Sequence, residues 1–294
     1  MKVLFIYNPH AGHMQIKNHL YDIVNTLSKT YDDLKIYASR SQKDILNYVK
    51  SNGTKYDLII VSGGDGSLSE AVNGLMNLKK KPKLGYVPAG STNDYANSLK
   101  LPKDMKKCAQ VLTNHKEEKQ IDIGKFNDNY FVYVAAFGAF TEVAYSTPQD
   151  VKNVIGHLAY FLNGITSLTK IKSYNMKFKY DDNNQIEDKF IFGMITNSLS
   201  VGGLYSLNSR NVKLDDGLFE VMLVKEPKDI IELQQITAYL INPKLKTNLV
   251  TTFKTSKLTI ETKNEVSWTL DGEYGGSPNK INIINKTKAI TLLK

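Results

Sequence analysis

The sequence predicts an N-terminal three-layer α/β domain followed by a β-sandwich-like domain. Up to about residue 125, short β-branched apolar runs alternate with segments whose apolar residues recur at helical spacing. This alternation implies βαβ units, a mostly parallel sheet and right-handed crossovers. After residue 125, short runs of alternating polarity are separated by turns rich in Asp, Asn, Gly and Lys. We therefore expect domains at 1–125 and 126–294, with the last residues able to pack back on the first domain.

The elements expected in the first domain alternate strictly along the chain. In order they are strand Val3–Tyr7, helix Ile16–Leu27, strand Leu34–Tyr37, helix Ile45–Val49, strand Leu58–Val61, helix Leu68–Leu75 and strand Leu84–Val87. In the second domain, strands are expected at Tyr130–Ala135, Met176–Tyr180, Lys189–Thr196, Leu218–Val224, Lys257–Glu261, Val266–Leu270 and Lys280–Ile284, and helices at Val151–Thr169 and Asp229–Leu240. No linker rich in Pro, Ser or Gly separates the domains, so we expect them to pack closely with a cleft between them.

Composition describes a globular protein with a sizeable core. Of the 294 residues, 41% are hydrophobic and 23% are charged, and no apolar run approaches the roughly 20 residues that span a bilayer. The apolar N-terminus is interpreted as the first strand rather than a signal peptide. Cys108 is the only cysteine, so no intrachain disulfide can form. We expect a cytoplasmic protein.

The net charge of +9 arises partly from two lysine clusters, at 79–83 and at 100–107. These clusters could face anionic lipid headgroups. A solvated lysine-rich face explains them more simply, and no interleaved aromatic residues indicate a nucleic-acid partner.

Three loops follow strand ends, where ligands bind in parallel α/β sheets. They are Asn8-Pro9-His10-Ala11-Gly12, Ser62-Gly63-Gly64-Asp65-Gly66-Ser67-Leu68-Ser69-Glu70 and Pro88-Ala89-Gly90-Ser91-Thr92-Asn93-Asp94. Glycines let a ligand approach the main chain, and the helix start that follows favours an anion, so the second loop predicts a phosphate-binding turn. The alternative is an ordinary turn between a strand and a helix. Asp65 is unexpected in a phosphate loop, because a bare carboxylate repels an anion.

These loops resemble the catalytic domain of diacylglycerol kinases and related lipid kinases. The resemblance continues in Val134–Gly138 with Thr147-Pro148, in Lys213–Leu218 and in Leu270–Gly276, which look like motifs of the soluble bacterial members. It implies an NAD kinase/phosphofructokinase-like first domain, with ATP and Mg²⁺ as cofactors. The departures from the family pattern are Ser67, where the family commonly has Thr, and His10, where a small or hydroxyl residue is frequent.

The resemblance assigns residues to the nucleotide and to a catalytic metal. The implied nucleotide contacts are Asn8, Pro9, His10, Ala11, Gly12, Ser39, Gly63, Gly64, Asp65, Gly66, Ser67, Glu70, Gly90, Ser91 and Asn93. Asp65, Asp94 and Asp122 are implied to organise the catalytic Mg²⁺, an ion that favours carboxylate and water oxygens. The alternative for Asp94 is a helix N-cap. Asp122 lies between apolar residues and needs a partner or a metal if it is buried.

A second centre is implied at Asp271-Gly272-Glu273. There Asp271 resembles the general base that accepts the proton of the lipid hydroxyl, with Glu273 as the neighbouring carboxylate that could take over the role. Without the family, Asp-Gly indicates a hairpin turn. The Asp216 carboxylate and the carbonyls of Lys213 and Leu218 resemble a structural Mg²⁺ site, for which the alternative is again a turn.

The expected function is that of an ATP- and Mg²⁺-dependent lipid kinase that phosphorylates diacylglycerol to phosphatidate, a step of phospholipid biosynthesis. The lipid would be reached from the inner face of the membrane, with the protein peripheral to it. Residues 151–168 could line an acyl-chain cavity, although core packing explains them more simply. The alternatives are a kinase of a sphingosine-like lipid, a kinase of a soluble metabolite such as NAD, or a regulatory lipid-binding protein. A homodimer is the default expectation.

Overall fold

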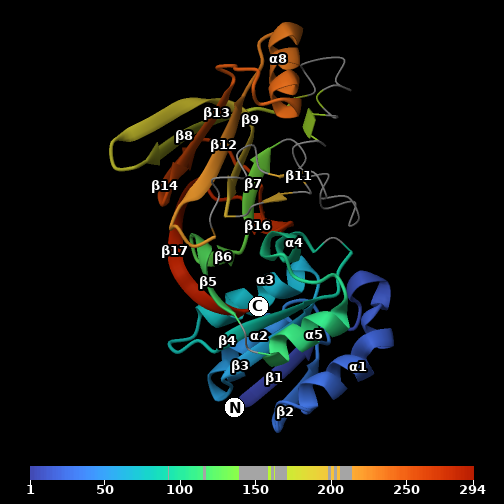
Figure 1. Ribbon diagram of the computed structural model, residues 1–294. Helices are drawn as coiled ribbons and strands as arrows, with labels where there is room; N and C mark the ends of the chain where they lie inside the picture. The colour runs from blue at the N-terminus through green and yellow to red at the C-terminus, as the bar shows by residue number, and fades with distance from the viewer. Residues whose placement is uncertain are drawn as a thin grey trace. The chain divides into compact units, whose positions relative to one another are not determined.

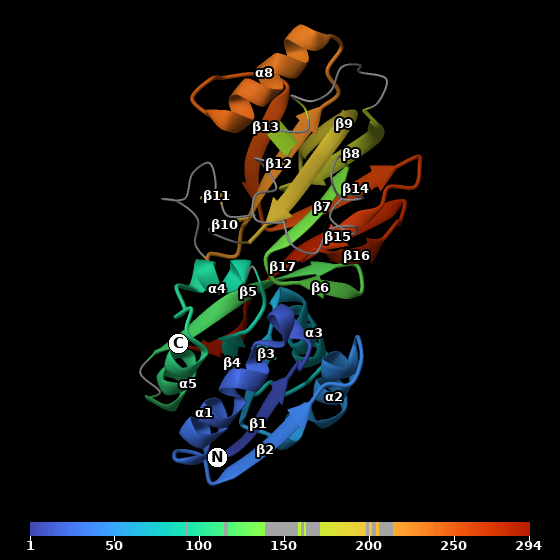
Figure 2. The same ribbon diagram turned by 90° about the vertical axis from the view of Figure 1, so that its right-hand side faces the viewer.

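A computed structural model describes residues 1–91, 93–114, 117–138, 158–159, 162, 171–197, 200–201, 204–205 and 214–294 (Figures 1 and 2). The chain divides into two compact units, one formed by residues 1–123 with 287–294 and the other by residues 124–286. The expected helix at 151–169, the suggested acyl cavity and Thr147-Pro148 fall largely or wholly outside the described residues. No helix among the described residues is both long enough and apolar enough to cross a membrane.

The first unit holds a parallel sheet with the order β4-β3-β1-β2. Its strands are β1 (Lys2–Tyr7), β2 (Asp33–Ala38), β3 (Leu58–Gly63) and β4 (Lys83–Pro88). Its helices are η1 (Ala11–Met14), α1 (Ile16–Ser28), α2 (Asp44–Asn52), η2 (Gly53–Lys55), α3 (Asp65–Met76), α4 (Asp94–Leu99) and α5 (Met105–Asn114). All the elements expected between residues 3 and 87 are present.

Alternating strand residues separate two helical layers in this unit. Phe5 and Ile60 belong to a core cluster with residues of α1 and α5, whereas Leu4 and Ile59 point to the opposite side, where α2 and α3 pack together. Figure 2 shows helices on both faces of the strands. The three-layer α/β architecture expected from the sequence is therefore confirmed.

The second unit is rich in strands, as expected. They are β6 (Asn129–Phe131), β7 (Val134–Gly138), β8 (Tyr174–Tyr180), β9 (Asn184–Thr196), β10 (Ser200–Val201), β11 (Leu204–Tyr205), β12 (Phe219–Lys225), β13 (Val250–Thr255), β14 (Lys257–Thr262), β15 (Trp268–Leu270) and β16 (Glu273–Gly276), with helix α8 (Ile230–Ile241). Two long strands, β5 (Glu118–Phe126) and β17 (Lys280–Leu293), pass through the boundaries between the units. The sequence indicated only the first part of β17, because residues 285–289 interrupt its apolar alternation.

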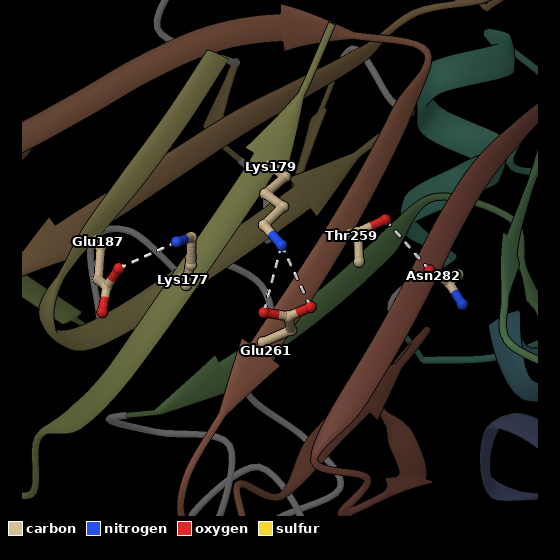
Figure 3. A network of polar contacts seen from close by, with 6 residues as sticks. All are labelled: Lys177, Lys179, Glu187, Thr259, Glu261 and Asn282. Atoms are coloured by element: carbon tan, nitrogen blue, oxygen red, sulfur yellow. Dashed lines mark hydrogen bonds and ion pairs between the residues drawn. The ribbon is translucent and has the colours of Figure 1, made fainter. Parts of the chain in front are cut away.

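Side chains on β8, β14 and β17 alternate between a core and a charged outer face. Met176, Phe178, Leu258 and Ile260 lie in the aromatic-rich core of the second unit. On the outer face, Lys177 pairs with Glu187 at 3.4 Å, Lys179 pairs with Glu261 at 3.4 Å, and Thr259 donates to Asn282 at 3.2 Å (Figure 3). Such cross-strand pairs, repeated at period two, set the register of the antiparallel strands.

The prediction of a single strand at residues 130–135 is wrong. β6 ends at Phe131 and β7 begins at Val134, and the two residues between them leave the ladder. Their backbone N–H groups, with that of Val134, donate to the carboxylate of Asp271. A partner 137–139 residues away therefore breaks a run that reads locally as one strand.

The rate at which a reagent labels the Cys108 thiol reports how tightly α5 packs against its neighbours. Burial raises the pKa of the Cys108 thiol to about 12, and Sγ donates to the carbonyl of Pro102 at 2.9 Å. Because the thiolate is the reactive species, we expect a thiol reagent at pH 8 to label the folded protein at least about 100-fold more slowly than the chain in urea. Rapid labelling without denaturant would show that α5 opens readily.

Candidate active site

The loops that follow β1, β3 and β4 meet through direct contact between their backbones. Gly12 has φ +52°, and a Cβ atom there would lie 2.0 Å from the carbonyl oxygen of Ala89. A Cβ on Gly90 would lie 2.5 Å from the Cα of Gly64. Only glycine permits such approaches. The structure therefore brings together the three loops that the sequence singled out, at the carboxyl edge of the parallel sheet.

Asn8 shapes the first loop and reaches the second. Its Oδ1 accepts the N–H of His10 at 2.9 Å, which closes an Asx turn, and its Nδ2 donates to Ser67 Oγ at 3.5 Å. A Cβ atom on Gly63 would lie only 2.3 Å from Ser67 Oγ, so a side chain at position 63 would collide with this hydroxyl. Asn8, Gly63 and Ser67 thus occupy one compact region. Pro9, Ala11 and Gly66 lie in the same two loops, and Ser91 is exposed in the third.

Ser39 and Glu70 lie at the same edge with different partners. Ser39 follows β2, is buried, and donates its N–H to the carbonyl of Tyr7 at 2.8 Å. Glu70 Oε1 accepts the N–H of Lys43 at 2.8 Å, just before α2 begins. Glu70 therefore supports the start of α2, a structural task that the sequence did not suggest.

Asn93 holds the third loop closed. Its Oδ1 accepts the N–H of Gly90 at 2.9 Å, and its Nδ2 donates to the carbonyl of Gly90 at 2.7 Å. The hydroxyl of Tyr86 lies 3.2 Å from the carbonyl of Gly63 and 3.4 Å from Asn93 Oδ1. Burial raises the pKa of Tyr86 well above its ordinary value, so this hydroxyl stays protonated as a donor. Sequence reasoning missed Tyr86, because within its strand it is indistinguishable from a core residue.

Asp65 caps the helix of the neighbouring loop. Its Oδ2 accepts the N–H of Asp94 at 3.0 Å and its Oδ1 that of Tyr95 at 3.3 Å, in the first turn of α4. Burial raises the pKa of Asp65, and these backbone donors partly oppose the effect. The N-cap residue of α4 is Asn93, so Asp94 is not the N-cap that was considered. Asp65 therefore has a partner that explains a carboxylate in this loop.

Asp122 is completely buried, and its Oδ1 accepts the N–H of Lys288 at 2.7 Å. Among the described residues, no three His, Cys, Asp or Glu side chains gather into a group that could hold a metal ion. Asp65, Asp94 and Asp122 thus do not form a preassembled cage. Mg²⁺ on a nucleotide commonly takes one or two protein carboxylates together with phosphate and water oxygens, and such a donor set suits this edge. The metal role of these residues stays a prediction.

The Asp271 segment forms the hairpin between β15 and β16. Asp271 and Gly272 both have positive φ, +51° and +87°, which is the signature of a type I′ turn. Asp271 is 4% exposed, and its carboxylate accepts the N–H groups of Val132, Tyr133 and Val134 at 2.7, 3.0 and 3.2 Å. The hairpin interpretation is therefore correct, and the same carboxylate holds the start of β7. Glu273, two residues on, is exposed.

The proposed structural magnesium loop is described only in part. Asp216 is exposed, and its Oδ1 accepts the N–H of Leu218 at 3.1 Å in a turn that leads into β12. Gly217 between them has φ +77°. Lys213 lies outside the described residues. A carboxylate with backbone carbonyls is a suitable donor set for Mg²⁺, and the ion remains a prediction.

Comparison with known proteins decides the family. Residues 2–126 match the diacylglycerol kinase catalytic domain. A diacylglycerol kinase of Staphylococcus aureus is 35% identical over 274 residues, which cover 92% of this chain and 85% of the relative. The chain belongs to the diacylglycerol kinase family. A diacylglycerol kinase of Bacillus subtilis is 31% identical over 92% of this chain and 89% of its own. Family membership makes the chain a kinase.

Solved structures extend the family likeness to nearly the whole chain. A putative diacylglycerol kinase from Bacillus anthracis superimposes with a TM-score of 0.82 at 29% identity, covering 99% of this chain and 96% of the other. An NAD kinase from Archaeoglobus fulgidus superimposes with a TM-score of 0.55 at 12% identity, covering 100% and 94%. The second likeness shows a shared fold alone. The NAD kinase-like fold implied by the family resemblance is therefore confirmed.

Substitution of two glycines of the site tests the close contact between the first and third loops. We expect Gly12→Ala to lower the free energy of unfolding by about 3 kcal/mol, because the new methyl group meets the Ala89 carbonyl and φ is positive. Gly64→Ala is the matched control: Gly64 has φ −85°, its nearest neighbour would be 3.4 Å away, and the expected change is below about 1 kcal/mol. Urea unfolding followed by far-ultraviolet circular dichroism measures both. Equal losses would contradict the contact between the first and third loops.

Proposed function

We propose that the chain transfers the γ-phosphoryl group of ATP to the hydroxyl of diacylglycerol, giving phosphatidate. The observation that carries the proposal is the convergence of the three glycine loops in a chain whose relatives are named diacylglycerol kinases. Phosphoryl transfer needs a cradle for the nucleotide's charge, and backbone N–H groups at glycine turns and the start of α3 supply one. Asn8, Gly63, Gly64 and Gly90 are the proposed core of the cradle.

Mg²⁺ would neutralise charge on the phosphates when bound, and Asp65 and Asp94 are the proposed nearby carboxylates. The lipid substrate implies that the protein works at a membrane surface, as a peripheral protein on the cytoplasmic side. An anionic bilayer suits a chain of net charge +9.

The contacts of the two hairpin carboxylates favour Glu273 over Asp271 as proton acceptor. Three backbone N–H groups occupy the Asp271 carboxylate, and they are left without an acceptor if it turns away. Glu273 is exposed, so it can accept a proton without breaking these bonds. In this arrangement Asp271 is a positioning residue that holds the hairpin on which Glu273 is carried.

A substrate panel tests the reaction. With labelled ATP and Mg²⁺, we expect kcat/KM for diacylglycerol in mixed micelles to exceed that for sphingosine or NAD⁺ at least tenfold. Removing the metal with a chelator should abolish transfer. A preference for NAD⁺ would assign the chain to metabolite phosphorylation, and a preference for sphingosine would change the lipid. Binding of lipid without any transfer would favour a regulatory protein.

Paired variants separate the hairpin carboxylates. We expect Glu273→Gln to lower kcat at least 100-fold, with the KM for ATP and the free energy of unfolding nearly unchanged. Asp271→Asn should lower the free energy of unfolding by about 1–3 kcal/mol, because an amide NH₂ then faces buried N–H donors. Fluorescence of the buried Trp268, three residues away, reports the unfolding. A near-normal kcat in Glu273→Gln would contradict Glu273 as the proton acceptor and would favour Asp271 instead.

A further inference from the structure

Helix α8 presents an apolar face to solvent. Ile230, Ile231 and Ile241 are 45%, 65% and 68% exposed, and Leu245, just beyond the helix, is 51% exposed. At about 100° per residue, the three isoleucines fall within an arc of roughly 100° on one side of the helix. The opposite side already packs into the second unit through buried residues such as Leu233, Ile236 and Leu240. The helix therefore carries apolar residues on both sides, and on the exposed side the uncharged Gln234 lies within the arc of the isoleucines.

The exposed face carries no charge. Glu232 is the one charged residue within α8, and its carboxylate accepts the N–H of Lys228 at 2.7 Å. The N–H of Glu232 in turn donates to the side chain of the N-cap residue Asp229 at 2.8 Å. Both acidic groups are thus engaged at the start of the helix. The other exposed residues of α8 are the uncharged Gln234 and Gln235, which do not carry the cost of burying an ion.

Lysines border this face at both ends. Lys228 is exposed just before the helix, and exposed Lys244 and Lys246 flank Leu245 just after it. An apolar helical face edged by lysines fits the boundary between acyl chains and anionic headgroups. A symmetric pair of these faces would instead bring like charges together, which disfavours a second copy of the chain as the occupant.

The lysine clusters suggested by the sequence lack this combination. Lys83 of the first cluster pairs with Glu118, and Lys106 of the second lies 3.8 Å from Asp22.

We propose that the exposed face of α8, formed by Ile230, Ile231, Ile241 and Leu245 and bordered by Lys228, Lys244 and Lys246, docks the protein on an anionic bilayer. The proposal rests on the proposed function, because a lipid substrate requires a membrane surface. Figures 1 and 2 show α8 beside β13 and β9. Within the second unit, β12 ends at Lys225, five residues before α8 begins. Near the other end of β12, Glu220 pairs with Thr196 of β9, and Thr196 pairs with Val134 at the start of β7, whose N–H donates to Asp271. Strand β12 is roughly 20 Å long, so docking does not touch the hairpin.

Binding to vesicles of phosphatidylglycerol and phosphatidylcholine tests the proposal. The double variant Ile230→Gln/Ile231→Gln keeps good helix formers and should bind at least tenfold more weakly than the unchanged protein. The matched control is Ile36→Thr/Ile284→Thr, which removes two isoleucines that are 41% and 42% exposed in strands and should bind within twofold of the unchanged protein. Vesicles of phosphatidylcholine alone should bind all three proteins weakly.

A tryptophan reporter locates the contact directly. In Ile231→Trp, the added indole should shift its emission to the blue with anionic vesicles, whereas buried Trp268 contributes a constant background. The absence of a shift, unchanged binding of the α8 variant, or equal losses in both double variants would overturn the proposal. A dimer in solution that the α8 variant converts to a monomer would overturn it in favour of self-association.

A soluble short-chain diacylglycerol separates this proposal from the proposed function. Both double variants should phosphorylate it within twofold of the unchanged rate, because neither alters the glycine loops or the hairpin. If the unchanged protein docks through α8 but phosphorylates no diacylglycerol, the docking surface stands and the proposed reaction fails. If it phosphorylates the short-chain lipid and the α8 variant still binds vesicles, the reaction stands and the docking surface fails.

Discussion

Contact between backbones at Gly12, Ala89, Gly64 and Gly90 is the constraint on which the candidate nucleotide site depends. A single methyl group at Gly12 or Gly90 would collide with main-chain atoms of a neighbouring loop. The contact is possible because β1, β3 and β4 lie side by side in parallel register and end at the same edge. Helix α3 begins at the second of these loops, so its N-terminal N–H groups lie at this edge, whereas those of Asp94 and Tyr95 in α4 donate to Asp65.

The carboxylates in this protein have structural partners as well as the chemical roles that the family suggests. Asp65 accepts N–H groups of α4, Asp122 accepts that of Lys288, and Asp271 accepts those at the start of β7. Each bond joins segments that are far apart in the sequence. Because a buried carboxylate without donors is costly, these acids stabilise the fold independently of any metal or substrate. Loss of activity after their substitution therefore needs a parallel measurement of stability.

Glu273 and the outer face of α8 differ from these buried carboxylates, because their proposed roles depend on exposure to solvent. Glu273 follows a rigid two-residue turn, so its backbone is held while its carboxylate remains accessible. The outward isoleucines of α8 leave much of their apolar surface in solvent, where it is available to a lipid surface. Both features belong to the second unit, residues 124–286.

The sequence by itself determined the order of strands and helices, the fold class and the three glycine loops, because periodicity and glycine spacing are local signals. It predicted the loops' convergence only through the general behaviour of parallel sheets. Tertiary structure alone decided that Asp65 caps α4, that Tyr86 reaches two loops, and that Asp271 divides one expected strand into β6 and β7. It also decided which side of α8 faces solvent. These outcomes depend on partners far away in the chain, and a residue carries no local mark of a distant partner.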